Sequence, residues 1–154
     1  MKNTGNLEGF LKRKVDEFNQ PFFIENDPIS IPHLFSKKQD IEIAGFFAAI
    51  FSWGNRTTII QKTKELMQRM DMSPYEFCLN YDLSGLKRLK GFKHRTFNED
   101  DLFYFVEFFH RHYQNSNTLE TAFIKNISKA SSAEGDVVGA ALIGFKKYFL
   151  SLEH

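Results

Sequence analysis

The residues best suited to bind a ligand lie in one short basic stretch. Positions 87–95 read Lys-Arg-Leu-Lys-Gly-Phe-Lys-His-Arg, with five fixed cations, one histidine and no acid. Gly91 permits a tight turn whose amides can face a phosphate, and cations that neutralise phosphates release counterions from DNA. The residues expected to hold phosphates are Lys87, Arg88, Lys90, Lys93 and Arg95. The alternative from these residues alone is a solvated loop with a charge cluster.

A second candidate is the turn Trp53-Gly54-Asn55-Arg56 between two predicted helices. Trp, Asn and Arg side chains at such a turn can wedge into a duplex or stack on a base. The alternative is that Trp53 is the last core residue of its helix and Arg56 lies on the surface. Within the basic stretch, Phe92 is expected to be a second wedge and His94 a base or phosphate contact.

No residue pattern indicates catalysis or metal binding. His110 and His112 are two positions apart, so they do not share a helix face, and Cys78 has no His or Asn partner at a suggestive spacing. There is no Gly-rich nucleotide loop after a strand and no serine elbow. We therefore assign no catalytic residue, no metal ligand and no cofactor. An enzyme acting on a small ligand in a Phe-lined pocket stays an alternative, which a cavity containing His110 or Cys78 beside a carboxylate would favour.

Composition limits the classes of function. A length of 154 residues suits a single domain over residues 1–154. The net charge is +1 and the pI about 7.8, below the value of roughly 9 typical of a strongly basic nucleic-acid binder. Any such surface must be a local patch. With one cysteine and no signal segment in the first twenty residues, we expect a cytoplasmic protein without disulfides and without a membrane partner.

The elements that must position both candidate stretches are helices. Residues 41–53 are apolar on almost every side, which predicts a central helix; thirteen residues are too few for the roughly 20 that span a bilayer. Ser36–Gln39 has capping-box spacing, Gly54-Asn55 supplies residues that tolerate positive φ, and Thr57 or Thr58 could cap a second helix.

Further helices are predicted on both sides of this pair. Apolar spacing and start signals indicate helices at 7–18, 74–80, 83–89, 98–113, from 118 and from 136 to 149, with an ordered loop at 22–33 and another at 131–135. Val137, Val138 and Ile127 are expected to face inward. The fold class is therefore all-α: a compact orthogonal bundle of about eight helices around the central helix near 40–53.

A family resemblance adds a function. Residues 48–52 followed by 57–62 resemble the helix-turn-helix near the start of endonuclease III-type, helix-hairpin-helix DNA glycosylases, and Gly91-Phe92 resembles a loop of that superfamily. Across its length the chain is similar to the N-terminal part of an uncharacterised bacterial family of unknown function, with Trp-Gly-x-Arg and His-Arg-x-Phe stretches. This resemblance implies a DNA-glycosylase-like fold with both turns at the mouth of a DNA-binding groove.

The resemblance does not supply an active site. The matching plug positions are Gly54 and Asn55, Lys93 stands where a hairpin glycine belongs, and the glycosylase catalytic Asp and Lys would fall beyond residue 154. We expect a DNA-binding, DNA-repair domain that contacts duplex or damaged DNA and is not catalytic on its own, from the N-terminal portion of a longer protein. The alternative is a helical interaction module whose partner is the missing C-terminal half or another protein.

Overall fold

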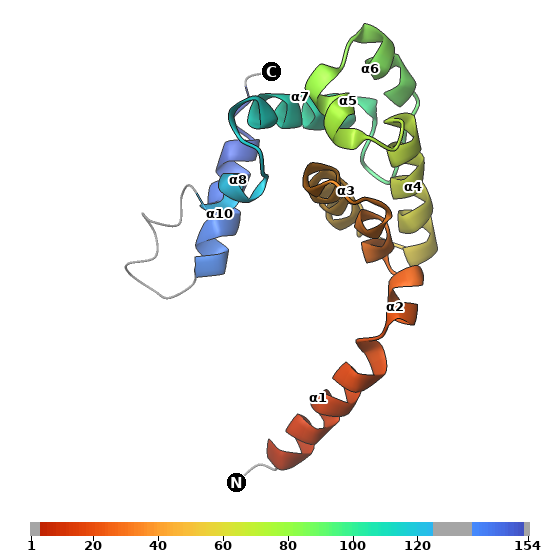
Figure 1. Ribbon diagram of the computed structural model, residues 1–154, viewed down its shortest axis with the longest axis vertical. Helices are drawn as coiled ribbons and strands as arrows, with labels where there is room; N and C mark the ends of the chain where they lie inside the picture. Colours follow the sequence, from red (N-terminus) through yellow and green to blue (C-terminus); the bar gives the residue numbers. More distant parts are fainter. Residues whose placement is uncertain (1–3, 125–136, 153–154) are drawn as a thin grey trace.

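The computed structural model describes residues 4–124 and 137–152. Within these ranges the backbone forms nine α-helices, two short 3-10 helices and no strand, so the predicted all-α class is confirmed (Figure 1). In chain order the elements are α1 (Thr4–Phe18), α2 (Pro21–Glu25), η1 (Pro28–Ser30), η2 (Pro32–Leu34), α3 (Lys38–Ile50), α4 (Arg56–Arg69), α5 (Pro74–Asn80), α6 (Leu83–Leu89), α7 (Glu99–Asn115), α8 (Glu120–Ile124) and α10 (Val137–Phe149).

Helix α3 is central, as its composition predicted. It packs against η2, α4 and α5, and its Phe46 and Phe47 rings meet Phe105 and Phe109 of α7 at centroid distances of 5.1–5.9 Å. Because Phe is bulky and pairs favourably edge-to-face, these rings fill the space between the two helices. The many phenylalanines of the sequence thus serve first as core.

The predicted start and stop of α3 were partly wrong. The residue before its first turn is Lys37, which makes no side-chain cap, so the Ser36–Gln39 capping box does not form. At the other end Gly54 has φ +122°, as expected of a residue that reverses the chain, but Asn55 has φ −73°. Its side chain instead accepts the Thr58 amide at 3.3 Å and caps α4, in place of Thr57 or Thr58.

Later helix starts follow the sequence signals closely. Asp82 accepts the Gly85 amide and caps α6, and Asn98 with Asp101 forms a full capping box at α7. Helix α5 begins at Pro74 as predicted, yet Ser73 makes no side-chain cap. The buried carboxylate of Asp40 on α3 accepts the Tyr75 amide at 2.9 Å instead, which ties the start of α5 to the central helix.

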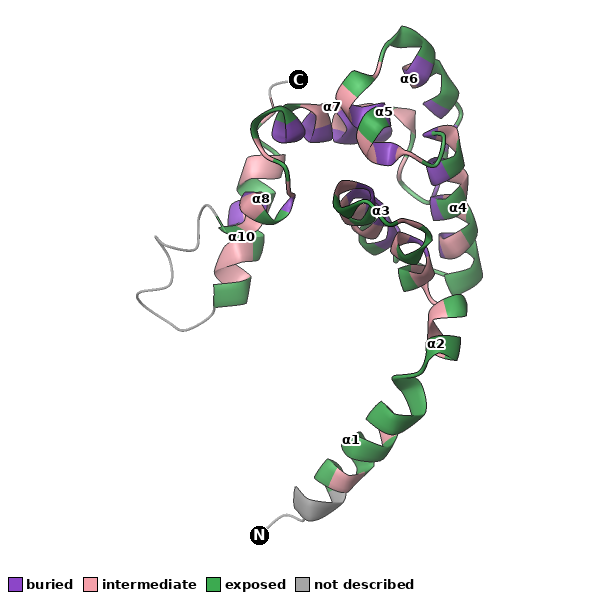
Figure 2. Ribbon diagram, in the orientation of Figure 1, coloured by how far each residue is buried: buried purple, intermediate pink, exposed green. Residues whose placement is uncertain are grey.

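The ends of the chain depart most from prediction. Residues 22–33, expected as a loop, are largely taken up by α2 and both 3-10 helices, since Pro21, Pro28 and Pro32 each begin a helical turn. The apolar side chains of α1 are exposed, and so are Val137 and Val138, which were expected inside (Figure 2). Phe18 still contacts the Phe23 ring of α2, with the ring centroids 6.0 Å apart. Ile127, the predicted 131–135 loop and the Asp136 cap lie outside the described residues.

Candidate nucleic-acid interface

The structure brings the two candidate stretches together. The segment after α6 folds over the end of α3: the Phe92 ring stacks on Phe51 at 5.6 Å, and a ring nitrogen of His94 lies 3.1 Å from the Phe51 carbonyl oxygen. Beyond them, the Arg95 guanidinium lies against Gly54. A Cβ atom built on Gly54 would be only 2.7 Å from Arg95 Cζ. A side chain at position 54 would displace this guanidinium, and the φ of +122° is itself a conformation that favours glycine.

A tight backbone turn holds this loop in shape. His94 and Phe97 exchange two backbone hydrogen bonds of 3.0 and 2.9 Å. Gly91 at φ +70°, which precedes the paired segment, and Arg95 at φ +58°, which lies within its turn, both occupy the left-handed region. Glycine adopts this conformation without strain, whereas an arginine in it is strained. Contacts with surrounding residues must therefore hold Arg95 there.

Phe92 and His94 are not available to a ligand, which corrects two assignments made from the sequence. Their exposed fractions are 2% and 4%. Local sequence showed only that they lie in a basic stretch. It could not show that both rings pack against Phe51, which lies more than forty positions earlier in the chain. They anchor the loop from inside and leave its charged side chains on the outer face.

Arg69 supports the same loop and was missed by sequence reasoning. Its Nη1 donates to the carbonyl oxygens of Arg88 and Lys90 at 2.9 and 2.8 Å, and its Nε and Nη2 bind Glu65 at 3.0 and 2.7 Å. Its guanidinium also lies 5.8 Å from the Phe92 ring centre. No local signal marks this role, since both carbonyl partners are about twenty residues further along the chain.

The five predicted phosphate-binding cations divide into two groups. Lys87, Lys90, Lys93 and Arg95 are exposed and form no ion pair within the part of the chain that the structure describes. Arg88 is different: it pairs with Asp71 and lies over the Phe77 ring at 5.3 Å. Its charge is therefore engaged on the α5 side of the molecule, away from the turn.

The predicted role of the Gly91 amide is also corrected. That amide donates to the carboxylate of Glu99 in the first turn of α7. The structure therefore fills this position with an internal anion, so in this state the amide is not open to a phosphate.

The turn 53–56 presents one aromatic side chain to solvent. Trp53 is 57% exposed, which rules out its being a core residue. The side-chain oxygen of Asn55 accepts the Thr58 amide and caps α4. Arg56 lies 3.9 Å from Asp27 and 5.8 Å from the Phe23 ring centre, so it faces the N-terminal segment. We refer to Trp53, Lys90, Lys93 and Arg95 as the basic turn surface.

A groove of about 460 Å³ adjoins this turn. Its lining is built mainly from small and cyclic side chains, which leave the α3 backbone close to the surface. The lining residues are Asp27, Pro28, Ile29, Pro32, Gly45, Ala48, Ala49, Ser52, Gly54, Arg56 and Ile59. The turn thus borders a hollow on one side and the basic loop on the other.

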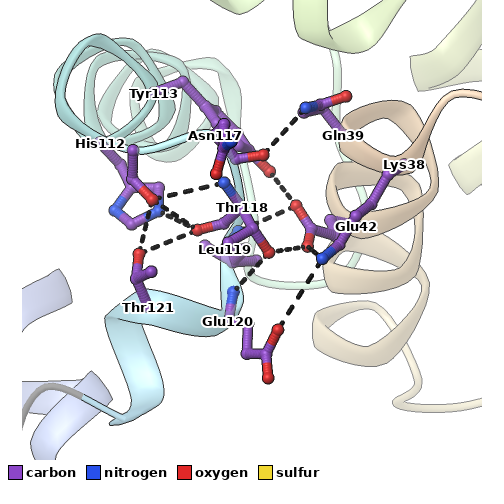
Figure 3. Close-up of polar contacts among 11 residues, drawn as sticks. Lys38, Gln39, Glu42, His112, Tyr113, Asn117, Thr118, Leu119, Glu120 and Thr121 are labelled. Carbon is purple, nitrogen blue, oxygen red and sulfur yellow. Dashed lines mark hydrogen bonds and ion pairs between the residues drawn. The ribbon is translucent and has the colours of Figure 1, made fainter.

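A polar cluster between α3 and α7 resembles a reactive site but is structural (Figure 3). The Glu42 carboxylate accepts Tyr113 Oη, Thr118 Oγ1 and the Leu119 amide at 2.9, 2.5 and 2.9 Å. His112 Nε2 lies 2.9 Å from the Thr118 carbonyl oxygen. Burial and the Glu42 charge raise the pKa of Tyr113. These contacts fasten the 116–119 segment to α3, and they occupy the atoms that chemistry would need.

The remaining candidates give no reactive group. Cys78 is buried, and this burial raises the pKa of its thiol, which opposes thiolate formation. His110 Nδ1 lies 3.1 Å from the Cys78 and Leu79 carbonyl oxygens. Over the described ranges, no group of three or more His, Cys, Asp or Glu residues could hold a metal ion. Nor is any helix there long and apolar enough to cross a membrane.

Comparison with known proteins identifies the family. Residues 27–154 match the model of a family described as "Protein of unknown function (DUF2400)". The chain belongs to this family. No curated protein and no solved structure matches it. The DUF2400 match includes the turn 53–56 and the loop 90–97, whereas α1 and α2 precede it. The expected membership of an uncharacterised family is confirmed; the similarity to DNA glycosylases stays a prediction.

Proposed function

We propose that this DUF2400 chain binds duplex or damaged DNA through the basic turn surface. The observation that carries the proposal is the contact of Arg95 with Gly54, which sets an exposed tryptophan beside a loop with three cations that form no ion pair among the described residues. Phosphate contacts would fix the duplex, and Trp53 would stack on a base or enter a gap. The chain would then act in DNA repair without catalysing a step itself.

Electrostatics sets the expected size of the effect. Three phosphate contacts give a slope of log K against log salt near −2.7, so affinity should fall roughly 40-fold between about 50 and 200 mM salt. Stacking of one base on Trp53 would add about 1–3 kcal/mol. Because the whole chain is nearly neutral, this binding depends on the local patch.

The first test uses Trp53, the only tryptophan of the chain. The protein is titrated with an intact duplex and with one that holds an abasic-site analogue, at low and moderate salt, by fluorescence and anisotropy. We expect stronger quenching by the abasic duplex and a steep loss of binding with salt. Binding to neither duplex would reject the proposal for this chain.

A paired substitution tests the cations. Lys90→Ala with Lys93→Ala should reduce the salt slope by about 1.8, because two phosphate contacts are lost, while the fold keeps its Lys90 carbonyl contact. The matched control is Lys146→Ala with Lys147→Ala, two exposed cations on α10. Equal slopes for both pairs would show that the basic turn surface does not hold phosphates.

A second candidate function is a protein-interaction module. The observation that favours it is the exposed apolar side of α1. The two functions use different surfaces and are compatible with each other.

A further inference from the structure

Helix α1 exposes a continuous apolar stripe. Its members lie at helical spacing on one side, and their exposed fractions run from 44% to 59%. They are Leu7, Phe10, Leu11, Val15 and Phe18. The helix extends away from the bundle in Figure 1 and is almost wholly exposed in Figure 2. Isolated helices of this length are marginal in water, since most helical stability comes from packing an apolar face. The stripe therefore needs a partner.

A groove with matching chemistry lies at the other end of the molecule. It has a volume of about 700 Å³ and is formed where the end of α3 and the start of α7 meet the end of α10. Its surface is mostly aromatic and aliphatic, with three acids among the lining residues. The lining comprises Ile50, Phe97, Asp100, Asp101, Phe103, Tyr104, Phe105, Glu107, Phe149, Leu150 and Leu152. We call this the α7–α10 groove.

One cation beside the stripe and one acid beside the groove carry opposite charges. Arg13 of α1 is exposed and unpaired within the described residues, whereas its neighbours Lys12 and Lys14 pair with Glu8 and Glu17. In the groove, Asp100 is exposed and likewise forms no ion pair in the described part of the chain. Such complementarity orients two surfaces on encounter and disfavours wrong partners.

We propose that α1 of one copy docks its apolar stripe into the α7–α10 groove of a second copy. The groove has the size of a site for a small ligand, so it would receive Phe10 and Leu11 rather than the whole stripe. The two surfaces belong to one chain but lie apart: α1 leaves from the α2 end, and α7 lies at the opposite end (Figure 1). In this arrangement (Figure 1), α1 does not reach the groove of its own copy.

The balance of charge on α1 favours this occupant over a lipid surface. Three cations, Lys12, Arg13 and Lys14, are offset by three acids, Glu8, Asp16 and Glu17. An amphipathic helix that lies on an anionic membrane usually has an excess of cations on its polar face. Since stripe and groove are different surfaces, two copies can exchange helices reciprocally to close a dimer, or add further copies in an open chain.

The test is the oligomeric state of the full chain. Sedimentation velocity over a wide concentration range should show reversible self-association. Phe10→Asp with Leu11→Asp should raise the dissociation constant at least about tenfold, because two buried apolar side chains would be replaced by charged ones. DNA binding by the same variant should be unchanged, which separates this inference from the proposed function. Lys64→Glu, an exposed charge change on α4, is the control.

Charge reversal tests the specific pairing. Arg13→Glu and Asp100→Arg should each weaken self-association, and the double variant should restore it. A wild-type chain that stays monomeric at all concentrations would overturn the proposal. So would self-association that survives the stripe variant with an unchanged circular dichroism spectrum. Stripe-dependent binding to phosphatidylserine vesicles by a monomer would assign the stripe to a membrane instead.

Discussion

Single side chains decide what the basic loop can do. The rings of Phe92 and His94 contact Phe51, and the Gly91 amide donates to Glu99. The outward cations are therefore the part of the loop that remains to meet a ligand. The sequence could predict those cations, because charge in an exposed turn needs no partner. It could not predict the burial of its neighbours, because their contacts lie more than forty residues away.

Removal of the Glu99 charge should strengthen DNA binding. Glu99→Gln keeps an oxygen for the Gly91 amide but removes a negative charge of α7 from beside a loop with three cations that no described acid pairs. We expect affinity to rise several-fold at low salt and the gain to shrink as salt screens it. Anisotropy titration measures both, with Asp16→Asn on α1 as the control. Weaker binding by the variant would mean that Glu99 positions the loop and does not oppose the DNA.

Arg69→Ala should loosen the loop from beneath. The change leaves the Arg88 and Lys90 carbonyl oxygens without their donor and Glu65 without one of its two cations. The expected loss of unfolding free energy is about 1–3 kcal/mol, measured by urea denaturation against Arg13→Ala, an exposed arginine without an ion pair in the described residues. DNA affinity should fall as well. An unchanged urea midpoint would show that the loop holds its shape without Arg69.

At the scale of elements, the sequence predicted where helices form but not which other elements they contact. Apolar periodicity and the Asp82 and Asn98 caps placed α6 and α7 correctly, because those signals act within a few residues. The start of α5 was found through Pro74, but the cap comes from Asp40, thirty-five residues earlier. Likewise, the stripe of α1 predicted a helix and could not tell whether anything covers it.

The α5 cap gives a direct comparison of the two kinds of signal. Asp40→Ala removes a buried acceptor from the Tyr75 amide and should cost about 0.5–2 kcal/mol of stability. Ser73→Ala removes the residue that the sequence marked as the cap, yet Ser73 makes no side-chain cap and its loss should be close to neutral. Thermal unfolding of both variants measures the difference. A larger effect of Ser73→Ala would contradict the observed cap.

At the scale of the whole molecule, the two proposals concern separate parts of the described chain. The basic turn surface lies within the DUF2400 match, whereas the α1 stripe precedes it. Composition predicted the first as a local patch because the net charge is near zero. Two carboxylates with lowered pKa values, Glu65 on α4 and Glu107 on α7, lie on different helices. Their protonation should therefore affect the stability of the whole molecule.

Stability should fall in acid. Burial opposes ionisation of Glu65, but hydrogen bonds from Lys62 and Arg69 hold its pKa below the ordinary value of 4.5. The Tyr81 hydroxyl and Arg111 lower the pKa of Glu107 in the same way. Both groups therefore add stability above about pH 4.5 that is lost as the pH falls through their lowered values. Chemical denaturation between neutral and acidic pH measures this, and Glu65→Gln with Glu107→Gln should flatten the profile.

The anchoring of Phe92 and His94 has a kinetic and entropic consequence. A loop whose inner side is part of the core cannot sample many conformations, so a partner that meets its cations pays little ordering entropy. The two amides of the His94–Phe97 pair, although they lie in a surface loop, should exchange with solvent deuterium almost as slowly as those of α3. Rapid association with little change in loop dynamics is the behaviour expected of such a preorganised edge.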